Sequence, residues 1–332
     1  MNEQQTTHYD VLVIGSGPTG IAVGAEARQA GLTAVLIDKG PLTASLLEFP
    51  TFMRFFTTRD RLEIGGVPFT VADEKPDRRQ ALVYYRAVVK VHGIEVRTHE
   101  EVLDARPLGD GLTVRTRSAR GEHSYQVRAV VVATGYFGQP RRLGVAGEEQ
   151  QPWVHQRYLE PLLHFDERVA LIGAGNSACE AALELWRSGA HVTLIHRRSE
   201  IKATVKYWVK PDIENRIAEG SIDALLDSTV QRFGDHKIYL EQAGEPRELE
   251  VDASYVLIGY RPDVALLERC GVEVSADELI PTFDETTGES NVPGLYIAGA
   301  VRSGIHTNRI FVDNSRDHGK SIVAEIKRRL SG

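Results

Sequence analysis

The sequence predicts an α/β protein built on parallel sheets, and three observations carry this prediction. Short apolar runs alternate with segments of helix-forming composition. Two glycine-rich turns, beginning at Gly15 and Gly173, each follow an apolar run and precede a helical segment. The chain has 332 residues, of which 42% are hydrophobic and 26% charged. A globular chain of this length forms about two domains of roughly 150 residues.

The first glycine turn lies in a strand–turn–helix–strand segment. We expect a strand at 11–14, the turn at 15–20 and a helix at 21–30. Gly31 ends this helix, and an apolar strand follows at 33–38. This order predicts a βαβ unit with parallel strands.

The second glycine turn repeats the same order. An apolar strand at 169–172 leads into the turn at 173–178, a helix runs to Ser188, and a strand follows at 192–196. The chain therefore contains two similar nucleotide-binding units.

The rest of the chain suggests where the domains divide. Two short segments with Gly, Tyr and Pro, 135–140 and 259–262, each follow an apolar strand and are expected to be hinges. Division there makes 138–261 an inserted domain and leaves 1–137 and 262–332 to form the first domain. The other expected elements are a helix at 78–92, strands at 113–117, 125–133, 237–240, 254–259 and 294–298, and a last helix ending near Leu330.

The first turn has the glycine spacing of a dinucleotide-binding site. Its three glycines, Gly15, Gly17 and Gly20, allow a tight turn and let the backbone approach a pyrophosphate. The helix that follows offers unpaired N–H groups and a partial positive charge. Asp38, at the end of the second strand, can accept hydrogen bonds from the ribose hydroxyls of an adenosine.

The second βαβ unit has basic residues at the end of its second strand, where the first unit has an acid. His196 stands at the same distance from Gly173 as Asp38 from Gly15, and Arg197 and Arg198 follow it. Two guanidinium groups can bind a 2′-phosphate that a carboxylate would repel. We expect the second site to prefer NADPH to NADH, with His196 as a secondary phosphate contact. The alternative is that the two arginines form a solvated basic loop.

Together the two units predict FAD in the first domain and NADPH in the second. NADPH would pass a hydride to the flavin, which carries the electrons onward. The predicted fold is two Rossmann-like three-layer dinucleotide-binding domains, with the NADPH-binding domain 138–261 inserted in the FAD-binding domain 1–137 and 262–332.

Composition excludes several classes of function. The net charge of −7 argues against a nucleic-acid partner. No metal-ligand spacing is present, and no apolar run reaches the roughly 20 residues of a membrane span. The N-terminus has no signal-peptide pattern. Two cysteines, Cys179 and Cys270, suit a reducing compartment, so we expect a cytoplasmic protein, and we also expect a homo-oligomer.

Further motifs carry a family resemblance. They are Ala133-Thr134-Gly135, His196-Arg197-Arg198 and the segment 294–299, Gly-Leu-Tyr-Ile-Ala-Gly. With the two glycine turns, they cover nearly the whole chain. The chain resembles the two-dinucleotide-binding-domain flavoproteins of the low-molecular-weight thioredoxin-reductase type. The segments 49–52, 55–58, 64–69, 81–86 and 176–178 make the likeness strongest to the bacillithiol-disulfide-reductase branch.

The resemblance implies an NADPH-dependent oxidoreductase that acts in redox homeostasis and passes electrons through FAD to a low-molecular-weight disulfide, above all bacillithiol disulfide. The cofactor-binding residues expected from the motifs and the resemblance are Gly15, Gly17, Pro18, Thr19, Gly20, Asp38, Lys39, Thr134, Gly135, Gly299 and Ala300 for FAD, and Gly173, Gly175, Asn176, Ser177, Ala178, His196, Arg197, Arg198 and Gly259 for NADPH.

Three departures from the relatives concern the chemistry. Thioredoxin reductases carry a redox C-x-x-C, which this chain lacks. Ala300 follows Gly299 where the usual pattern has an aspartate that binds the flavin ribityl chain. Thr19 stands where many members of the branch have a cysteine. We therefore expect the FAD itself to be the reactive group. Cys179 is a weak candidate thiol, because a helix N-terminus can lower a thiol pKa, although a small buried packing residue is the simpler interpretation.

Three other features could shape a substrate site. Arg198, Lys202, Lys206 and Lys210 are four residues apart and would form a cationic stripe on a helix that Pro211 ends. The stripe would bind NADPH phosphates or an anionic thiol, or would simply be solvated.

The aromatic segment 49–56 would either pack in the core or form a wall beside the isoalloxazine ring. Arg302, His306 and Arg309 follow the last predicted strand. They could bind substrate anions or stabilise the negative charge of the reduced flavin.

Alternative functions remain at this point. A flavin monooxygenase also has two glycine motifs, but it typically carries the motif Phe-x-Gly-x-x-x-His-x-x-x before an aromatic residue. This chain lacks the Phe-x-Gly of that motif at the right spacing. A ferredoxin or flavodoxin NADP reductase needs no dithiol. A non-catalytic flavin redox sensor is the fourth hypothesis.

Overall fold

The computed structural model describes residues 7–331, and the chain divides into two compact units. Unit 1 comprises Met1–Gln139 and Arg261–Gly332, and unit 2 comprises Pro140–Tyr260. Short strands at the two crossings, β7 (Gln139–Pro140) and β16 (Tyr260–Arg261), pair with each other.

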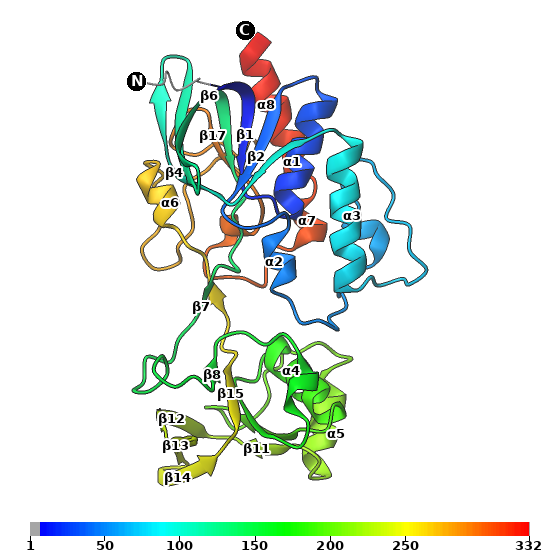
Figure 1. The fold of residues 1–332 in the computed structure, drawn as a ribbon, viewed down its shortest axis with the longest axis vertical. Helices are drawn as coiled ribbons and strands as arrows, with labels where there is room; N and C mark the ends of the chain where they lie inside the picture. Colours follow the sequence, from blue (N-terminus) through cyan, green and yellow to red (C-terminus); the bar gives the residue numbers. More distant parts are fainter. Residues whose placement is uncertain (1–6, 332) are drawn as a thin grey trace. The chain divides into compact units, whose positions relative to one another are not determined.

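Unit 1 contains a sheet of seven strands in the order β3-β2-β1-β6-β5-β4, with β17 paired to β6. Figure 1 labels β1, β2, β4, β6 and β17 of this sheet. Strands β3, β2, β1, β6 and β17 run parallel, and β4 and β5 continue from β6 as an antiparallel meander. The strand bounds are β1 (Thr7–Ile14), β2 (Ala34–Asp38), β3 (Glu95–Thr98), β4 (Glu100–Leu108), β5 (Gly111–Ser118), β6 (Gly121–Val132) and β17 (Leu295–Ile297).

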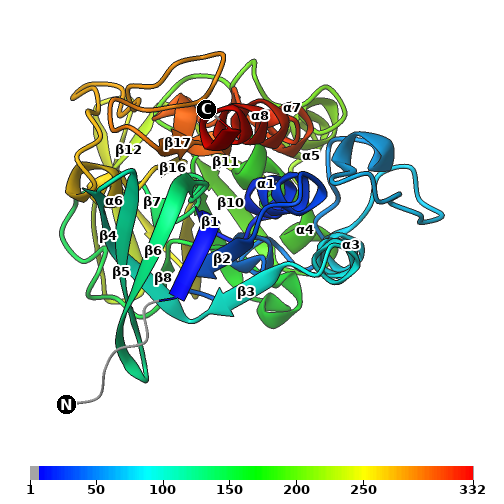
Figure 2. The same cartoon turned by 90° about the horizontal axis from the view of Figure 1, so that it is seen from above.

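Helices α1 (Pro18–Gln29), α3 (Arg78–Val91) and α8 (His318–Ser331) gather on one face of the parallel strands in unit 1 (Figure 2). The opposite face is buried beneath β4, β5 and the short helix α6 (Ala265–Arg269). Unit 1 is completed by α2 (Ala44–Leu47), α7 (Val312–Ser315) and the 3₁₀ helices η1 (Arg59–Leu62) and η3 (Gly299–Ser303).

The central parallel strands β1 and β2 of unit 1 are buried on both faces along most of their length, which explains their composition. In β1, Val11 and Val13 pack beneath the helices while Leu12 and Ile14 pack toward the meander. Parallel strands covered on both sides read as continuous apolar runs rather than as alternating ones. The sequence therefore shows the strand but not which face each residue takes.

Unit 2 repeats the three-layer plan with a parallel sheet in the order β11-β10-β9-β15-β8. Helices α4 (Asn176–Arg187) and α5 (Lys210–Ala218) pack on one face, and an antiparallel sheet of β12, β13 and β14 packs on the other. The strand bounds are β8 (Val154–His155), β9 (Arg168–Ile172), β10 (His191–Ile195), β11 (Asp223–Leu225), β12 (Ser228–Gly234), β13 (Lys237–Gln242), β14 (Glu245–Glu250) and β15 (Ala253–Val256), and the 3₁₀ helix η2 (Pro161–His164) precedes β9.

These two units confirm the predicted fold class, a pair of three-layer α/β domains with one inserted in the other. The expected boundaries, 137/138 and 261/262, lie beside those of the structure. Within residues 7–331, no helix is long and apolar enough to cross a membrane.

The predicted cationic stripe is wrong. The segment between β10 and α5 is irregular, and α5 begins at Lys210 with Pro211 in its first turn. Proline has no N–H to bond within a helix but fits the first turn, so Pro211 begins this helix rather than ending one. Asn176 fixes part of the irregular segment, because its Oδ1 accepts from the backbone N–H of Lys206 at 2.9 Å.

Candidate functional site: two glycine loops

The first glycine loop joins β1 to α1, and two of its three glycines are required by the fold. Gly15 has φ +108°, and a Cβ there would lie 2.6 Å from the carbonyl oxygen of Ala133. A Cβ on Gly20 would lie 2.0 Å from the carbonyl oxygen of Gly15. No side chain fits at either position, so these glycines bring β1, β6 and α1 together.

Gly17 differs, because the protein itself leaves room beside it. Gly17 is the N-cap of α1, with extended backbone at φ −74° and ψ 179°. The nearest atom to a Cβ there would be Oγ of Ser45 at 3.9 Å. No side chain caps α1, and Pro18 begins it without an N–H. The open N-terminus can therefore receive a pyrophosphate, and these residues fit FAD.

Asp38 ties the end of β2 to this loop. Its Oδ2 accepts from the backbone N–H and the hydroxyl of Ser16 at 2.7 and 2.9 Å, and its Oδ1 accepts from the N–H of Gly40 at 2.8 Å. A carboxylate has about four acceptor positions. Asp38 can thus hold the loop and still accept from a ribose hydroxyl, while exposed Lys39 follows it.

Thr19, in the first turn of α1, contacts residues from the last third of the chain. Its hydroxyl lies 3.0 Å from that of Ser315, which donates to the carbonyl of Phe311 at 2.6 Å. Because the Ser315 proton is used there, Thr19 is the donor in the Thr19–Ser315 bond. A Cβ on Gly299 would lie 2.9 Å from Oγ1 of Thr19, so η3 lies against the same loop.

The remaining expected FAD residues lie at the carboxyl ends of neighbouring strands. Thr134 and Gly135 follow β6, with Thr134 exposed and Gly135 at φ +69°. Ala300 lies in η3 directly after β17. Ligands of open α/β sheets bind at this edge.

The second glycine loop joins β9 to α4 and has the same design. Gly173 has φ +127°, and a Cβ there would lie 2.4 Å from the carbonyl oxygen of Leu257. Ala178 packs at the place of the third glycine, 3.7 Å from that Cβ position. Gly175 is the N-cap of α4, and among the described residues no atom lies within 4 Å of a Cβ placed on it, its chain neighbours aside.

A basic pocket lies at the end of β10, beside this loop's second strand. It has a volume of about 470 Å³ and is lined by Arg197, Arg198, Ser199, Glu200, Ile201, Lys202, Ala203 and Asp227. Arg197 and Arg198 are exposed. The pocket therefore presents exposed cationic side chains of the kind that bind a phosphate.

His196 is buried beside this pocket, and no atom of the described chain bonds its Nε2. Burial, followed by the nearby charges of Lys202, Arg198 and Arg197, lowers the pKa of His196. A neutral ring can donate one hydrogen bond to a phosphate but adds no charge.

The other expected NADPH residues have different surroundings. Asn176 holds the irregular segment, as described above, and Ser177 is exposed in the first turn of α4. Gly259 follows β15 with φ +104°, and its carbonyl accepts from the N–H of Arg141 at 2.9 Å.

Comparison with known proteins decides the family. Residues 12–299 match the model of the pyridine nucleotide-disulphide oxidoreductase family. The chain belongs to this family. Proteins of the family are flavoproteins that use a nicotinamide dinucleotide, so the cofactors are FAD and NAD(P)H.

The chain is also similar to individual proteins of this family. The chain is 36% identical over 320 residues to bacilliredoxin reductase Bdr of Bacillus subtilis, covering 96% of this chain and 97% of that one. It is 26% identical over 304 residues to a ferredoxin–NADP reductase of Ignicoccus hospitalis, covering 88% and 90%. The solved bacillithiol disulfide reductase Bdr of Bacillus cereus superimposes with a TM-score of 0.93 at 33% identity, covering 97% of this chain and all of that one. The predicted resemblance is confirmed.

This member of the pyridine nucleotide-disulphide oxidoreductase family keeps both its thiols buried. Cys179, in the first turn of α4, has no exposed surface, and Cys270 is 3% exposed. Burial raises the pKa of Cys179 to about 12, with smaller effects from Glu180 and Glu214, and burial also raises the pKa of Cys270. The helix N-terminus does not offset burial, so neither thiol becomes a thiolate near neutral pH.

Three residues of unit 1 were missed by the sequence reasoning. Ser16 bonds Asp38, Ser315 bonds Thr19, and His318 accepts from the N–H of Gly299. Ser16 lies inside the motif, where a hydroxyl could have been noticed. Ser315 and His318 are far along the chain and show no local pattern.

The substrate-side candidates fall into different environments. Phe55 is buried in the core, Phe49 packs edge-on against Phe137 with centroids 4.9 Å apart, and Phe52 is exposed. The segment therefore serves packing in part. Arg302 is buried over the ring of Phe283, so it is not available to a substrate anion.

The two residues that follow Arg302 in this set also differ. His306 pairs with Glu278 at 2.8 Å, whereas Arg309 is exposed. Of the three basic residues, only Arg309 presents an exposed side chain for a substrate anion.

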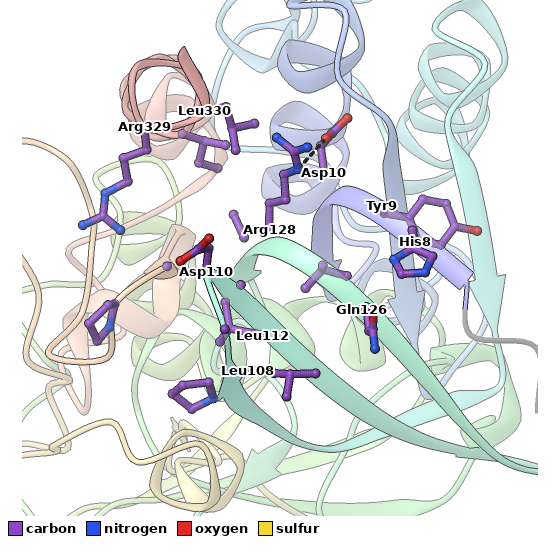
Figure 3. Close-up of a pocket in the computed structure, with 18 of the residues that line it drawn as sticks. His8, Tyr9, Asp10, Leu108, Asp110, Leu112, Gln126, Arg128, Arg329 and Leu330 are labelled. Carbon is purple, nitrogen blue, oxygen red and sulfur yellow. Dashed lines mark ion pairs between the residues drawn. The ribbon is translucent and has the colours of Figure 1, made fainter. Parts of the chain in front are cut away.

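Another cavity lies away from the glycine loops. Its volume is about 1060 Å³, and Figure 3 shows it at the amino end of β1, among residues of the β4–β5 turn and the end of α8. Asp10 and Arg128 pair across 3.6 Å within it (Figure 3). Ligands of such sheets bind at the opposite, carboxyl edge. The glycine loops lie at that carboxyl edge, and this cavity does not.

No group of His, Cys, Asp and Glu in the described chain is arranged to hold a metal ion.

Proposed function

We propose that this flavoprotein oxidises NADPH and passes the electrons through FAD to a low-molecular-weight disulfide, with bacillithiol disulfide as the first candidate. The observation that carries the proposal is the pair of glycine loops, each with one N-cap glycine that the protein leaves open. The similarity to bacilliredoxin reductase Bdr and to the bacillithiol disulfide reductase of Bacillus cereus supports the choice of acceptor.

The basic pocket supports NADPH over NADH. Arg197, Arg198 and Lys202 surround a space of about 470 Å³ at the end of β10. In unit 1 the same position holds Asp38, whose carboxylate is committed to the loop. The lining of the unit 2 pocket carries three cations against two carboxylates, Glu200 and Asp227, whereas Asp38 presents a carboxylate at the corresponding place in unit 1. Charge therefore favours a 2′-phosphate in unit 2 over unit 1.

The buried thiols bear on how the disulfide is reduced. A protein dithiol would have to expose a thiolate to attack the substrate. Both cysteines of the chain are buried with raised pKa values. Thr19, at the place of a cysteine in many relatives, already donates its proton to Ser315. We infer that bound reduced FAD supplies both electrons to the disulfide without a protein thiol.

The test is anaerobic reduction of the purified protein by NADPH, followed by a set of acceptors. We expect a yellow protein whose flavin bleaches with NADPH and is reoxidised by bacillithiol disulfide. Reoxidation by ferredoxin alone would replace the proposal with a ferredoxin–NADP reductase, and rapid oxygen consumption would replace it with a monooxygenase. A reducible flavin that no acceptor reoxidises would favour a redox sensor.

We further propose a cytoplasmic homo-oligomer. Two unpaired thiols suit a reducing compartment. Leu162, Leu163 and Phe165 of unit 2 are 62%, 72% and 76% exposed, and such a cluster is typical of an interaction surface. Light scattering of the holoenzyme tests this, and a monomer at micromolar concentration would contradict it.

A further inference from the structure

His318 joins the beginning of α8 to the turn after β17. The backbone N–H of Gly299 donates to Nδ1 of His318 at 3.0 Å. Because a backbone N–H can only donate, Nδ1 must carry a lone pair, and the ring proton of the neutral form is then on Nε2. His318 is therefore an acceptor at this turn only while its ring is neutral.

Arg302 lies close to this histidine and helps keep it neutral. Burial, then the charge of Arg302, lowers the pKa of His318 to about 4, while the carboxylate of Asp317 acts in the opposite direction. Arg302 is 8% exposed, and its Nε donates to the carbonyl of Ile297 at 2.8 Å. Its guanidinium lies over the ring of Phe283 at 4.7 Å from the centroid. The guanidinium is thus held within unit 1 rather than free to reach a ligand.

The turn that His318 holds is packed against the first glycine loop. Gly299 has φ +75°, and a Cβ there would lie 2.9 Å from Oγ1 of Thr19 in the first turn of α1. Helix α8 lies equally close to α1, because a Cβ on Gly319 would lie 3.0 Å from Cα of Val23. His318 therefore stands on a helix whose position relative to α1 is fixed by packing.

We propose that His318 is a positioning residue for FAD, which as a neutral acceptor fixes the Gly299–Ala300 turn against the open N-terminus of α1. The proposal rests on the proposed function only in placing FAD at this loop. Ala300 brings no polar side chain of its own to the turn. Without His318, the N–H of Gly299 loses its acceptor, and the turn is free to move against Thr19.

The experiment compares three variants as FAD-free proteins titrated with FAD. His318→Leu removes the acceptor, and His318→Asn keeps one, because the amide oxygen of Asn stands near the place of Nδ1. His123→Leu is the matched control in unit 1, where Nε2 of His123 lies 3.2 Å from Oγ of Ser118 on the β5–β6 hairpin. Flavin fluorescence gives the dissociation constant, and the visible spectrum and reduction potential report on the bound flavin.

We expect His318→Leu to weaken FAD binding roughly tenfold or more, the effect of one unpaired buried donor. His318→Asn should stay within roughly threefold of the wild type and restore its flavin spectrum, and His123→Leu should leave FAD binding unchanged. Equal FAD affinity of His318→Leu and the wild type overturns the inference, and so does failure of His318→Asn to restore binding. A wild-type protein that binds no FAD would instead overturn the proposed function.

Discussion

The two N-cap glycines allow cofactor binding to be separated from folding, and Gly17→Val is the sharpest test. The backbone at Gly17 is extended, which valine adopts readily, and the nearest protein atom lies 3.9 Å from a Cβ. Replacing glycine at an N-cap by an apolar residue costs about 1 kcal/mol. We therefore expect FAD-free Gly17→Val to fold, and to unfold at a temperature only slightly below that of the wild type.

FAD binding should respond much more strongly. The valine side chain would occupy the space through which the pyrophosphate reaches the N–H groups of α1. Losing two hydrogen bonds to a charged group costs about 3–6 kcal/mol, or roughly two to four decades in affinity. Titration of the FAD-free protein with FAD, followed by flavin fluorescence, measures the loss.

Two companion variants sharpen this test. Gly175→Val, at the open N-cap of α4, should leave a yellow protein that NADPH no longer reduces at ordinary concentrations. Gly20→Ala should fail to fold well, because its Cβ would lie 2.0 Å from the carbonyl oxygen of Gly15. Near-normal FAD affinity in Gly17→Val would refute the assignment of this loop, as would loss of the FAD-free fold.

Three further predictions concern the two arginines, the two cysteines and His318. Replacing both Arg197 and Arg198 with alanine should cost about 1.5–3 kcal/mol of binding free energy per lost contact. The KM for NADPH should rise roughly tenfold or more, while the KM for NADH should change little. Equal losses for both cofactors would show that the arginines do not bind the 2′-phosphate. The double variant Cys179→Ser and Cys270→Ser should keep flavin reduction and disulfide turnover in stopped-flow assays, and loss of turnover alone would restore a role for a thiol. Between pH 6.5 and pH 4, His318 should contribute a fall of roughly 2.5 kcal/mol to the free energy of unfolding, because its pKa is about 4 when folded and 6.5 when unfolded, and the protonated ring favours the unfolded chain. His318→Asn should lose less stability over the same interval in denaturant titrations, and identical profiles would contradict this.

The repeated βαβ units could be predicted because each carries a local pattern. The apolar runs at 11–14 and 169–172 lie within β1 and β9, and the glycines at 15 and 173 follow directly. Most of the antiparallel strands were harder to place. Strand β14, Glu245–Glu250, is mostly exposed and has the composition of a polar loop, so only its pairing with β13 makes it a strand.

The candidate site also has a part that could be predicted from the sequence and a part that could not. The residues within each loop follow from spacing, but the groups that hold the loops come from distant parts of the chain. Ser315 reaches Thr19 of α1, and His318 reaches Gly299 beside it, only because α7 and α8 pack against α1. The helical interpretation of 198–210 failed because charge spacing alone cannot show that Asn176 fixes part of the segment in an irregular form.

The two glycine loops differ at two corresponding positions. In unit 1, Asp38 accepts from both the N–H and the hydroxyl of Ser16, so the acid at the end of β2 also holds the glycine loop. In unit 2 the corresponding residues are Ala174, which has no hydroxyl, and His196, whose Nε2 is left unbonded within the described chain. The second loop therefore does not depend on an acid at the end of its strand, and that strand end is free to present arginines to a phosphate. It follows that changing Asp38 alone to a basic residue would loosen the FAD loop before it created a phosphate site.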